Sequence, residues 1–121
     1  MHRLASLPGD DLEEEFTLVE QTDSAVIFLT STTTDIACLS STLKLEEHSE
    51  LESQIRALPL KALEHPAQID HYLSSSAQRT KVIVVRLLGS RGHWSYGLEQ
   101  LQLWVNEKSD RNLIVLSGTR E

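Results

Sequence analysis

The stretch KVIVVRLL, residues 81–88, is followed directly by GSRGHWSYGLEQL, residues 89–101. Its first part is short, β-branched and apolar at successive positions, which is typical of a strand covered on both faces of a parallel sheet. Its second part passes through a turn containing Gly89 and Gly92 and becomes helical from about Ser95, with an apolar face formed by Leu98, Leu101 and Val105. We therefore predict a buried strand that enters a helix through a glycine-rich turn.

Four other segments resemble strands. AVIFLT, residues 25–30, has the same apolar pattern as residues 81–88, so we predict that these two segments are the central parallel strands. LIVL, residues 113–116, is a shorter version of that pattern. RLASL, residues 3–7, and RALPL, residues 56–60, are weaker candidates and are predicted to be edge strands.

Helical patterns separate these strands. Thr34 or Asp35 can cap a helix whose apolar face holds Ile36, Leu39 and Leu43, and Pro66 suits the first turn of another, whose apolar stripe is Ile69, Tyr72, Leu73 and Ala77. Strands that alternate with helices form βαβ units. We expect an α/β three-layer sandwich with a parallel sheet of four or five strands, flavodoxin-like or Rossmann-like. Such a fold usually continues into another helix after its last strand, whereas the sequence stops at SGTRE, which hints at a piece of something longer.

Composition limits the possible functions. The 121 residues are enough for a single domain, residues 1–121. Eleven Lys and Arg against 18 Asp and Glu give a net charge of −7, which argues against nonspecific binding to nucleic acid or anionic lipid. The single cysteine, Cys38, excludes an internal disulfide, fits a reducing compartment and is expected in the core. With no signal-peptide or membrane-span pattern, we expect a soluble, cytoplasmic protein.

The glycine-rich turn carries the residues best suited to binding. Ligands of open α/β sheets bind where the strands end at their carboxyl edge, and the turn is expected there. Gly89 and Gly92 permit close backbone approach, and Arg91 could offer a forked donor to a carboxylate or phosphate. The alternative is a tight strand-to-helix turn whose aromatic side chains close the core. Neither the full G-x-G-x-x-G pattern nor a P-loop lysine is present.

RLLGSRGHWSYGLEQL, residues 86–101, resembles the N-terminal region of the large subunit of aerobic cobaltochelatase, the CobN type, a family related to the large subunit of magnesium chelatase. In that family an apolar strand leads into Arg-Leu-Leu-Gly-Gly-Arg, an aromatic pair with Trp, and Tyr-Gly-Leu-Glu-Gln-Leu. LEHPAQIDHY, residues 63–72, is similar to its Leu-x-His-Pro run followed by Asp and Tyr. Ser90 replaces the second glycine of the family, His93 stands where an aromatic residue is usual, and family members are far longer.

The resemblance implies a part in inserting cobalt into a corrin ring, hydrogenobyrinic acid a,c-diamide, in cobalamin biosynthesis. The large subunit holds the tetrapyrrole and the metal, and separate AAA+ partner subunits hydrolyse ATP. This segment would be a structural, substrate-adjacent domain that binds no cofactor or metal itself, carries no catalytic residue and is inactive alone. Peripheral carboxylates of the ring would pair with arginine and aromatic side chains would pack on it. The candidate substrate-binding residues are Arg86, Arg91, Trp94, Tyr96, Glu99 and His65.

These candidates also have structural interpretations. Arg86 could pair with Glu99 or Asp70, and Trp94 and Tyr96 could close the core. Glu99 is expected in the first turn of its helix, where the helix dipole stabilises a carboxylate. His65 could be a helix cap or a loop residue, a role independent of any ligand.

Two other functions compete with the chelatase interpretation. The first is a stand-alone module that binds a tetrapyrrole or another anionic small molecule at the edge formed by residues 89–96. The second is an α/β interaction domain whose sheet edge and acidic N-terminal loop meet a protein partner.

Overall fold

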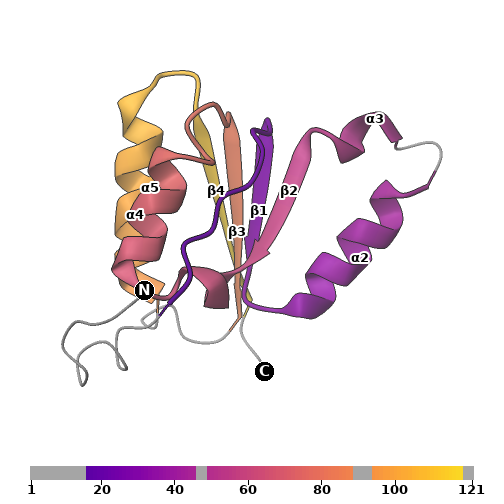
Figure 1. Ribbon diagram of the computed structural model, residues 1–121, viewed down its shortest axis with the longest axis horizontal. Coiled ribbons are helices and arrows are strands. Elements are labelled where there is room, and N and C mark those ends of the chain that lie inside the picture. The colour runs from indigo at the N-terminus through magenta and orange to yellow at the C-terminus, as the bar shows by residue number, and fades with distance from the viewer. Residues whose placement is uncertain (1–15, 46–48, 89–93, 119–121) are drawn as a thin grey trace, which may run out of the picture.

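A computed structural model describes residues 16–45, 49–88 and 94–118, and it is an α/β sandwich (Figure 1). Its centre is a parallel sheet of four strands in the order β2-β1-β3-β4. Helices α4 (Pro66–Ser74) and α5 (Ser95–Glu107) lie on one side of the sheet, and α2 (Thr33–Leu43) with the short α3 (Ser49–Glu52) lies on the other. The predicted three-layer fold with a parallel sheet is confirmed.

The strands follow the apolar segments of the sequence. β1 (Val26–Thr30) and β3 (Val82–Leu88) are the two inner strands, as predicted, and they pair with each other from Val26–Val82 to Thr30–Arg86. β2 (Ile55–Pro59) and β4 (Asn112–Gly118) are the edges. The edge prediction for residues 56–60 is therefore confirmed, and the predicted strand at residues 3–7 lies outside the described residues.

The helix starts are fixed by side-chain caps. Helix α2 begins after Thr32, whose hydroxyl oxygen accepts a hydrogen bond from the Thr34 amide at 3.1 Å, so the predicted caps at Thr34 and Asp35 were two to three residues late. His65 caps α4, because its Nδ1 accepts a hydrogen bond from the Ala67 amide at 3.1 Å. Gln68 completes this cap by accepting a hydrogen bond from the His65 amide at 2.9 Å. The structural interpretation of His65 as a helix cap is confirmed.

The hydrophobic core lies between the sheet and helices α4 and α5. Alternate strand residues point into it, because successive side chains of a strand face opposite sides of a sheet. Among the side chains of this core, eight that come from β1, β3, α4 and α5 are at most 2% exposed: Ile27, Leu29, Ile83, Val85, Ile69, Tyr72, Leu101 and Trp104. Burial raises the pKa of Tyr72, whose hydroxyl donates to Gln21 Oε1 at 2.5 Å. Trp104 was missed by the sequence analysis.

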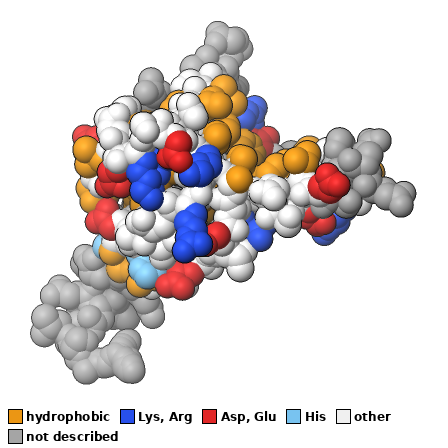
Figure 2. Space-filling model, turned by 90° about the horizontal axis from the view of Figure 1, so that it is seen from above, with side chains coloured by type: hydrophobic (Ala, Val, Ile, Leu, Met, Phe, Trp, Pro, Cys, Tyr) orange, Lys and Arg blue, Asp and Glu red, His pale blue; other side chains and the backbone are white. Residues whose placement is uncertain are grey.

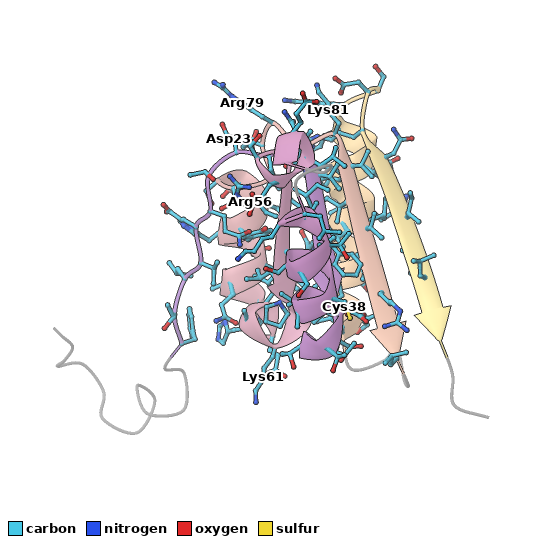
Figure 3. All side chains as sticks on the ribbon, turned by 90° about the vertical axis from the view of Figure 1, so that its right-hand side faces the viewer. Asp23, Cys38, Arg56, Lys61, Arg79 and Lys81 are labelled. Carbon is cyan, nitrogen blue, oxygen red and sulfur yellow. The ribbon has the colours of Figure 1, made fainter. Side chains whose placement is uncertain are left out.

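The opposite face of the sheet is only partly covered. Leu43 is the one buried side chain of α2, all of which is described, and Ile36 and Leu39 of the predicted apolar face are half-buried. Figure 3 looks onto this face and shows β3 and β4 beside α2, with no described helix in front of them. Cys38 is exposed, so the prediction of a core cysteine was wrong: nothing among the described elements packs over its side of α2. None of the described helices is long and apolar enough to cross a membrane.

Candidate functional site

The strand order reverses between β1 and β3, and we call this place the switch point of the sheet. From β1 the chain proceeds through α2 to β2 on one side, and from β2 it crosses to β3 on the other. The strand order 2-1-3-4 is that of flavodoxin-like sheets, in which ligands bind outside the carboxyl ends of the strands at this point. The residues that end β1 and β3 are therefore the first place to look for a site.

Three side chains join β1, α2 and β3 at this switch point. Arg86 and Thr30 are register partners on the α2 face, and Arg86 forms an ion pair with Asp35 through its Nη1 and the Asp35 Oδ2. The fully buried Thr30 hydroxyl donates to the same carboxylate oxygen at 2.8 Å. The hydrogen bond from Thr30, followed by the bond and charge of Arg86, lowers the pKa of Asp35. Asp35 is thus held as an anion beside a half-exposed guanidinium.

Three backbone amides at this point, those of Ser31, Thr32 and Thr34, are already used. Thr32 N–H donates to Thr30 Oγ1 at 3.2 Å, and Ser31 N–H donates to the carbonyl of Arg86 at 3.1 Å. Ser31 Oγ in turn accepts from Leu88 N–H at 3.0 Å. With Thr34 N–H bonded to the Thr32 hydroxyl, the start of α2 offers these amides to its own chain. Arg86 is therefore the charged donor at this point that could recognise an anion.

An apolar groove leads away from Arg86 along the partly covered face. It lies between α2 and the sheet, has a volume of about 380 Å³, and ends against Leu116 of β4. Its lining is apolar except for the Arg86–Asp35 pair and comprises Val26, Phe28, Cys38, Leu39, Ile55, Val84 and Leu116. Figure 2 shows hydrophobic side chains gathered in the angle between the body and the projecting arm of α2 and α3. An apolar groove with one cation at its end suits a ligand that is largely apolar and carries an acidic group.

The aromatic residues of the opening stretch lie on the other side of the sheet. Trp94 is 7% exposed, and its Nε1 donates to the carbonyl of Leu63 at 3.1 Å. A methyl group on Gly97 would lie 2.3–2.6 Å from atoms of the Trp94 ring, so the glycine makes room for the tryptophan. Tyr96 is 37% exposed, and its hydroxyl lies 3.0 and 3.1 Å from the two carboxylate oxygens of Asp70. Trp94 therefore closes the core, and Tyr96 keeps an exposed ring.

The predicted site residues consequently divide between two sides of the sheet. Arg86 faces the groove, and its ion-pair partner is Asp35 rather than the predicted Glu99 or Asp70. The prediction that Glu99 lies in the first turn of its helix was wrong, because α5 begins at Ser95 and the exposed Glu99 follows that turn. The pKa of Tyr96 is raised by the hydrogen bond to Asp70 first, then by burial, and the charge of Glu99 adds to this shift. The His65 ring stacks on Phe16 with centroids 4.0 Å apart.

Part of the predicted site lies outside the described residues. Arg91 and both turn glycines fall within residues 89–93, and so does His93. Across residues 16–45, 49–88 and 94–118, no group of three or more His, Cys, Asp or Glu side chains could hold a metal ion. The described part of the site is thus an arginine beside an apolar groove.

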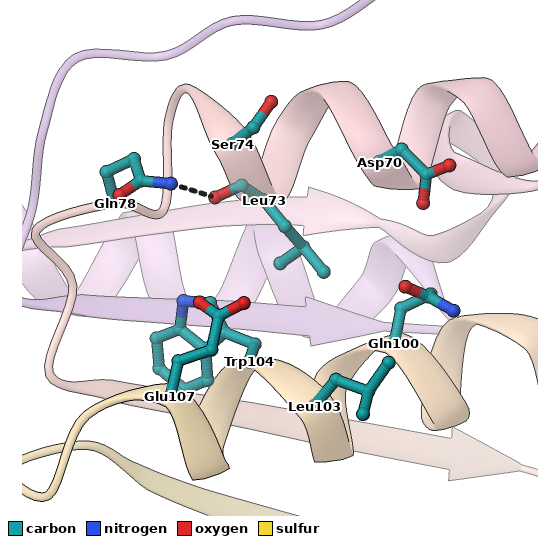
Figure 4. A pocket seen from close by; sticks show the side chains of 8 residues that line it. All are labelled: Asp70, Leu73, Ser74, Gln78, Gln100, Leu103, Trp104 and Glu107. Carbon is teal, nitrogen blue, oxygen red and sulfur yellow. Dashed lines mark hydrogen bonds between the residues drawn. The ribbon is translucent and has the colours of Figure 1, made fainter.

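A second hollow lies between α4 and α5 (Figure 4). Its lining mixes Leu73 and Trp104 with the polar side chains of Asp70, Gln78 and Glu107, and Gln78 Nε2 donates to the Leu73 carbonyl at 3.4 Å.

Arg111, which the sequence analysis missed, supports the Trp104 side of this hollow. It is 5% exposed, its Nη1 donates to the Trp104 carbonyl at 2.7 Å, and its guanidinium lies 4.5 Å from the ring centroid. Its Nη2 donates to the Gln78 carbonyl at 3.0 Å. These bonds tie the end of α5 to the loop after α4, so we interpret the region as structural.

The fold and the site define an α/β domain with a parallel sheet, an arginine at its switch point and an open apolar groove. No protein-family profile matches the chain, and no solved structure matches it. Among characterised proteins, the chain is similar to the aerobic cobaltochelatase subunit CobN of a Sinorhizobium species, with 30% identity over 83 residues. The match covers 67% of this chain and 6% of that subunit, so this chain spans a small fraction of the relative's length.

Proposed function

We propose that this chain is a structural, substrate-adjacent domain of a cobaltochelatase large subunit. In this role it would work with the remainder of such a subunit and with ATP-hydrolysing AAA+ subunits that insert cobalt into hydrogenobyrinic acid a,c-diamide. The similarity to a cobaltochelatase subunit carries the proposal. The groove at Arg86 supports it, because a corrin is a broad, largely apolar ring with carboxylates at its rim.

Arg86 is the residue that we assign to a peripheral carboxylate of the ring. Asp35 engages Nη1, and the remaining donors of the guanidinium have no hydrogen-bond partner among the described residues. An arginine fork can bind one carboxylate on each side, so a ligand carboxylate need not displace Asp35. Asp35 then acts as a positioning residue that holds the fork toward the groove.

The apolar lining of the groove would contact the face of the ring. Phe28 and Val84 belong to adjacent strands and both line the groove, and Leu39 lines it from α2. Burying ring surface against these side chains would contribute roughly 25 cal/mol per Å² of apolar area removed from water. Affinity would come from this contact and from Arg86, which would also orient the ring.

An absorbance titration of hydrogenobyrinic acid a,c-diamide with the chain tests this assignment. We expect a shift of the corrin absorbance band that saturates with protein concentration. Arg86→Gln should weaken binding about tenfold or more, because a hydrogen bond to a charged group contributes about 1.5–3 kcal/mol. The matched control is Arg79→Gln, since Arg79 is an exposed arginine remote from the groove lining, and it should bind like the parent.

Two results would count against the proposal. An unchanged corrin spectrum at saturating protein would exclude contact between the ring and this chain. ATP-independent cobalt insertion by the chain alone would contradict its role as an inactive part of a larger machine.

A stand-alone tetrapyrrole-binding module is the second candidate, and the open groove is the observation that favours it. Both candidates predict ring binding, but only the first predicts that the chain acts together with the rest of a cobaltochelatase. If a complete cobaltochelatase neither binds the chain nor changes its rate when the chain is added, and the chain still binds the ring, the module is the better assignment.

A further inference from the structure

The start of α2 contains a capping box that is only half formed. Residues 32–35, TTTD, have the pattern in which the N-cap side chain binds an amide of the first turn and an acidic side chain three residues later binds the N-cap amide. The first half is present, because the Thr32 hydroxyl oxygen accepts from the Thr34 amide at 3.1 Å. The second half is missing, because the Thr32 amide donates to Thr30 Oγ1 at 3.2 Å and not to Asp35. The Asp35 carboxylate is therefore available to another partner.

The Thr30 hydroxyl directs this carboxylate to Arg86. It donates to Asp35 Oδ2 at 2.8 Å, and the same oxygen forms the ion pair with Arg86 Nη1. Thr30 is fully buried in β1 and is the register partner of Arg86 in β3, so the strand pairing fixes the place of its hydroxyl. One hydroxyl thus takes the amide that Asp35 would otherwise cap and also holds Asp35 beside Arg86.

The guanidinium of Arg86 depends on this contact for its position. The Arg86 side chain is 37% exposed, and among the described residues Asp35 is its one hydrogen-bond partner. A long side chain without such an anchor samples several rotamers, and ordering it when a ligand binds reduces the affinity. Both Arg86 and Asp35 line the apolar groove, so the anchored guanidinium lies at the groove before a ligand arrives.

We propose that Thr30 is a positioning residue for the groove: its hydroxyl keeps Asp35 out of the helix cap and thereby holds Arg86 ready for a ligand carboxylate. The inference rests on the proposed function in one respect, namely that a carboxylate of the ring binds Arg86. The arrangement of Thr30, Asp35 and Arg86 can be tested without the ring.

The effect of removing the hydroxyl follows from the relative size of two interactions. Thr30→Val leaves the Thr32 amide without its acceptor. An unpaired backbone donor costs more free energy than a half-exposed ion pair contributes, so the Asp35 carboxylate should turn to the Thr32 amide and complete the capping box. Arg86 then loses its anchor, although neither Arg86 nor Asp35 has been changed.

An absorbance titration with hydrogenobyrinic acid a,c-diamide measures the consequence for binding. Thr30→Val should weaken ring binding about three- to tenfold, and Thr30→Ser, which keeps the hydroxyl, should bind within about twofold of the parent. The matched control is Thr80→Val. Thr80 is also buried, and its hydroxyl donates to the Ser24 carbonyl at 2.8 Å, but it does not line the groove, so this variant should bind like the parent.

A double-mutant cycle separates positioning from a general loss of structure. Because Thr30 acts through Asp35, Thr30→Val should change ring affinity by less than about twofold when Asp35→Ala is already present. A hydroxyl that only stabilised the fold would give the same loss of affinity in both backgrounds, and this result would overturn the proposal. Equal losses in Thr30→Val and Thr80→Val would overturn it as well.

Crystal structures of the parent and of Thr30→Val, both without the ring, give a second readout. In the variant, the Asp35 carboxylate should accept from the Thr32 amide and should no longer contact Arg86. An Asp35–Arg86 contact that is the same in both structures would overturn the proposal. If the parent does not bind the ring, the proposed function fails, whereas the two crystal structures still decide whether Thr30 positions Arg86.

Discussion

On one face of the sheet, α4 and α5 bury Ile83 and Val85 completely, whereas on the other face Ile114 and Leu116 keep almost half of their surface in water. Ile83 and Val85 belong to the inner strand β3, whereas Ile114 and Leu116 belong to the edge strand β4, and no described helix lies over β4 on the second face. The first face is closed and contains the core. The second face is open beyond α2 and contains Arg86, the groove and the exposed residues of β4. The core thus lies on one side of the sheet, and the binding that we propose lies on the other.

The largest expected effect comes from truncating a leucine on each face. Leu29→Ala removes a 1% exposed side chain from the closed face and should lower the free energy of unfolding by about 2–5 kcal/mol. Leu39→Ala removes a half-buried side chain from the groove and should cost less than about 1 kcal/mol. Urea unfolding followed by tryptophan fluorescence measures both. Equal costs for the two variants would show that the open face contributes as much to the fold as the closed one.

Gly97→Ala should give a smaller loss on the closed face. Alanine is favoured over glycine inside a helix by up to about 1 kcal/mol, so helix propensity alone predicts a more stable protein. The added methyl group would overlap the Trp94 ring, and crowding of this kind costs about 1–3 kcal/mol. We therefore expect a net loss of stability in thermal unfolding. Ser95→Ala, an exposed change in the same helix, should be close to neutral, and a stabilised Gly97→Ala would contradict the packing of Trp94.

The smallest effect concerns the dependence of stability on pH at the open face. The pKa of Asp35 is lowered in the folded protein, first by the hydrogen bond from Thr30 and then by Arg86, from an unfolded value of about 3.9. Ionised Asp35 therefore stabilises the fold above about pH 4, and this contribution is lost as the pH falls through the folded pKa. Urea unfolding at a series of pH values measures it.

Two variants isolate this contribution. The difference in stability between the parent and Asp35→Asn should be constant from about pH 5 to 8 and shrink below about pH 4. In Thr30→Val, which removes the first cause of the lowered pKa, the acid loss attributable to Asp35 should be smaller and should be complete at a higher pH. A difference that grows on acidification would reverse the assigned direction of the pKa shift.

The comparison of the two faces also explains how far the sequence could predict the fold. Residues 25–30 and 81–88 were predicted as inner strands because a strand buried on both sides must be apolar at successive positions. His65 before Pro66 was open to the interpretation of a cap because proline suits the first turn of a helix. Such local signals predict elements well, because they depend only on neighbouring residues.

The open face was harder to predict because its features depend on distant residues. Asp35 lies 51 positions from Arg86, and no local pattern indicates that β1, α2 and β3 bring them together. Cys38 was expected in the core because the helix was assumed to be covered on its apolar side, whereas the described structure leaves that side open. The start of α2 was misplaced because Thr32, Thr33 and Thr34 are consecutive and each has a hydroxyl that could cap a helix.

Hydrogen–deuterium exchange of the chain with and without hydrogenobyrinic acid a,c-diamide tests most directly whether binding belongs to the open face. The account predicts that the ring slows exchange in α2, residues Thr33–Leu43, and leaves α4 and α5 unchanged. Slower exchange in α5 around Tyr96, with α2 unchanged, would contradict it and place the ring on the opposite side of the sheet.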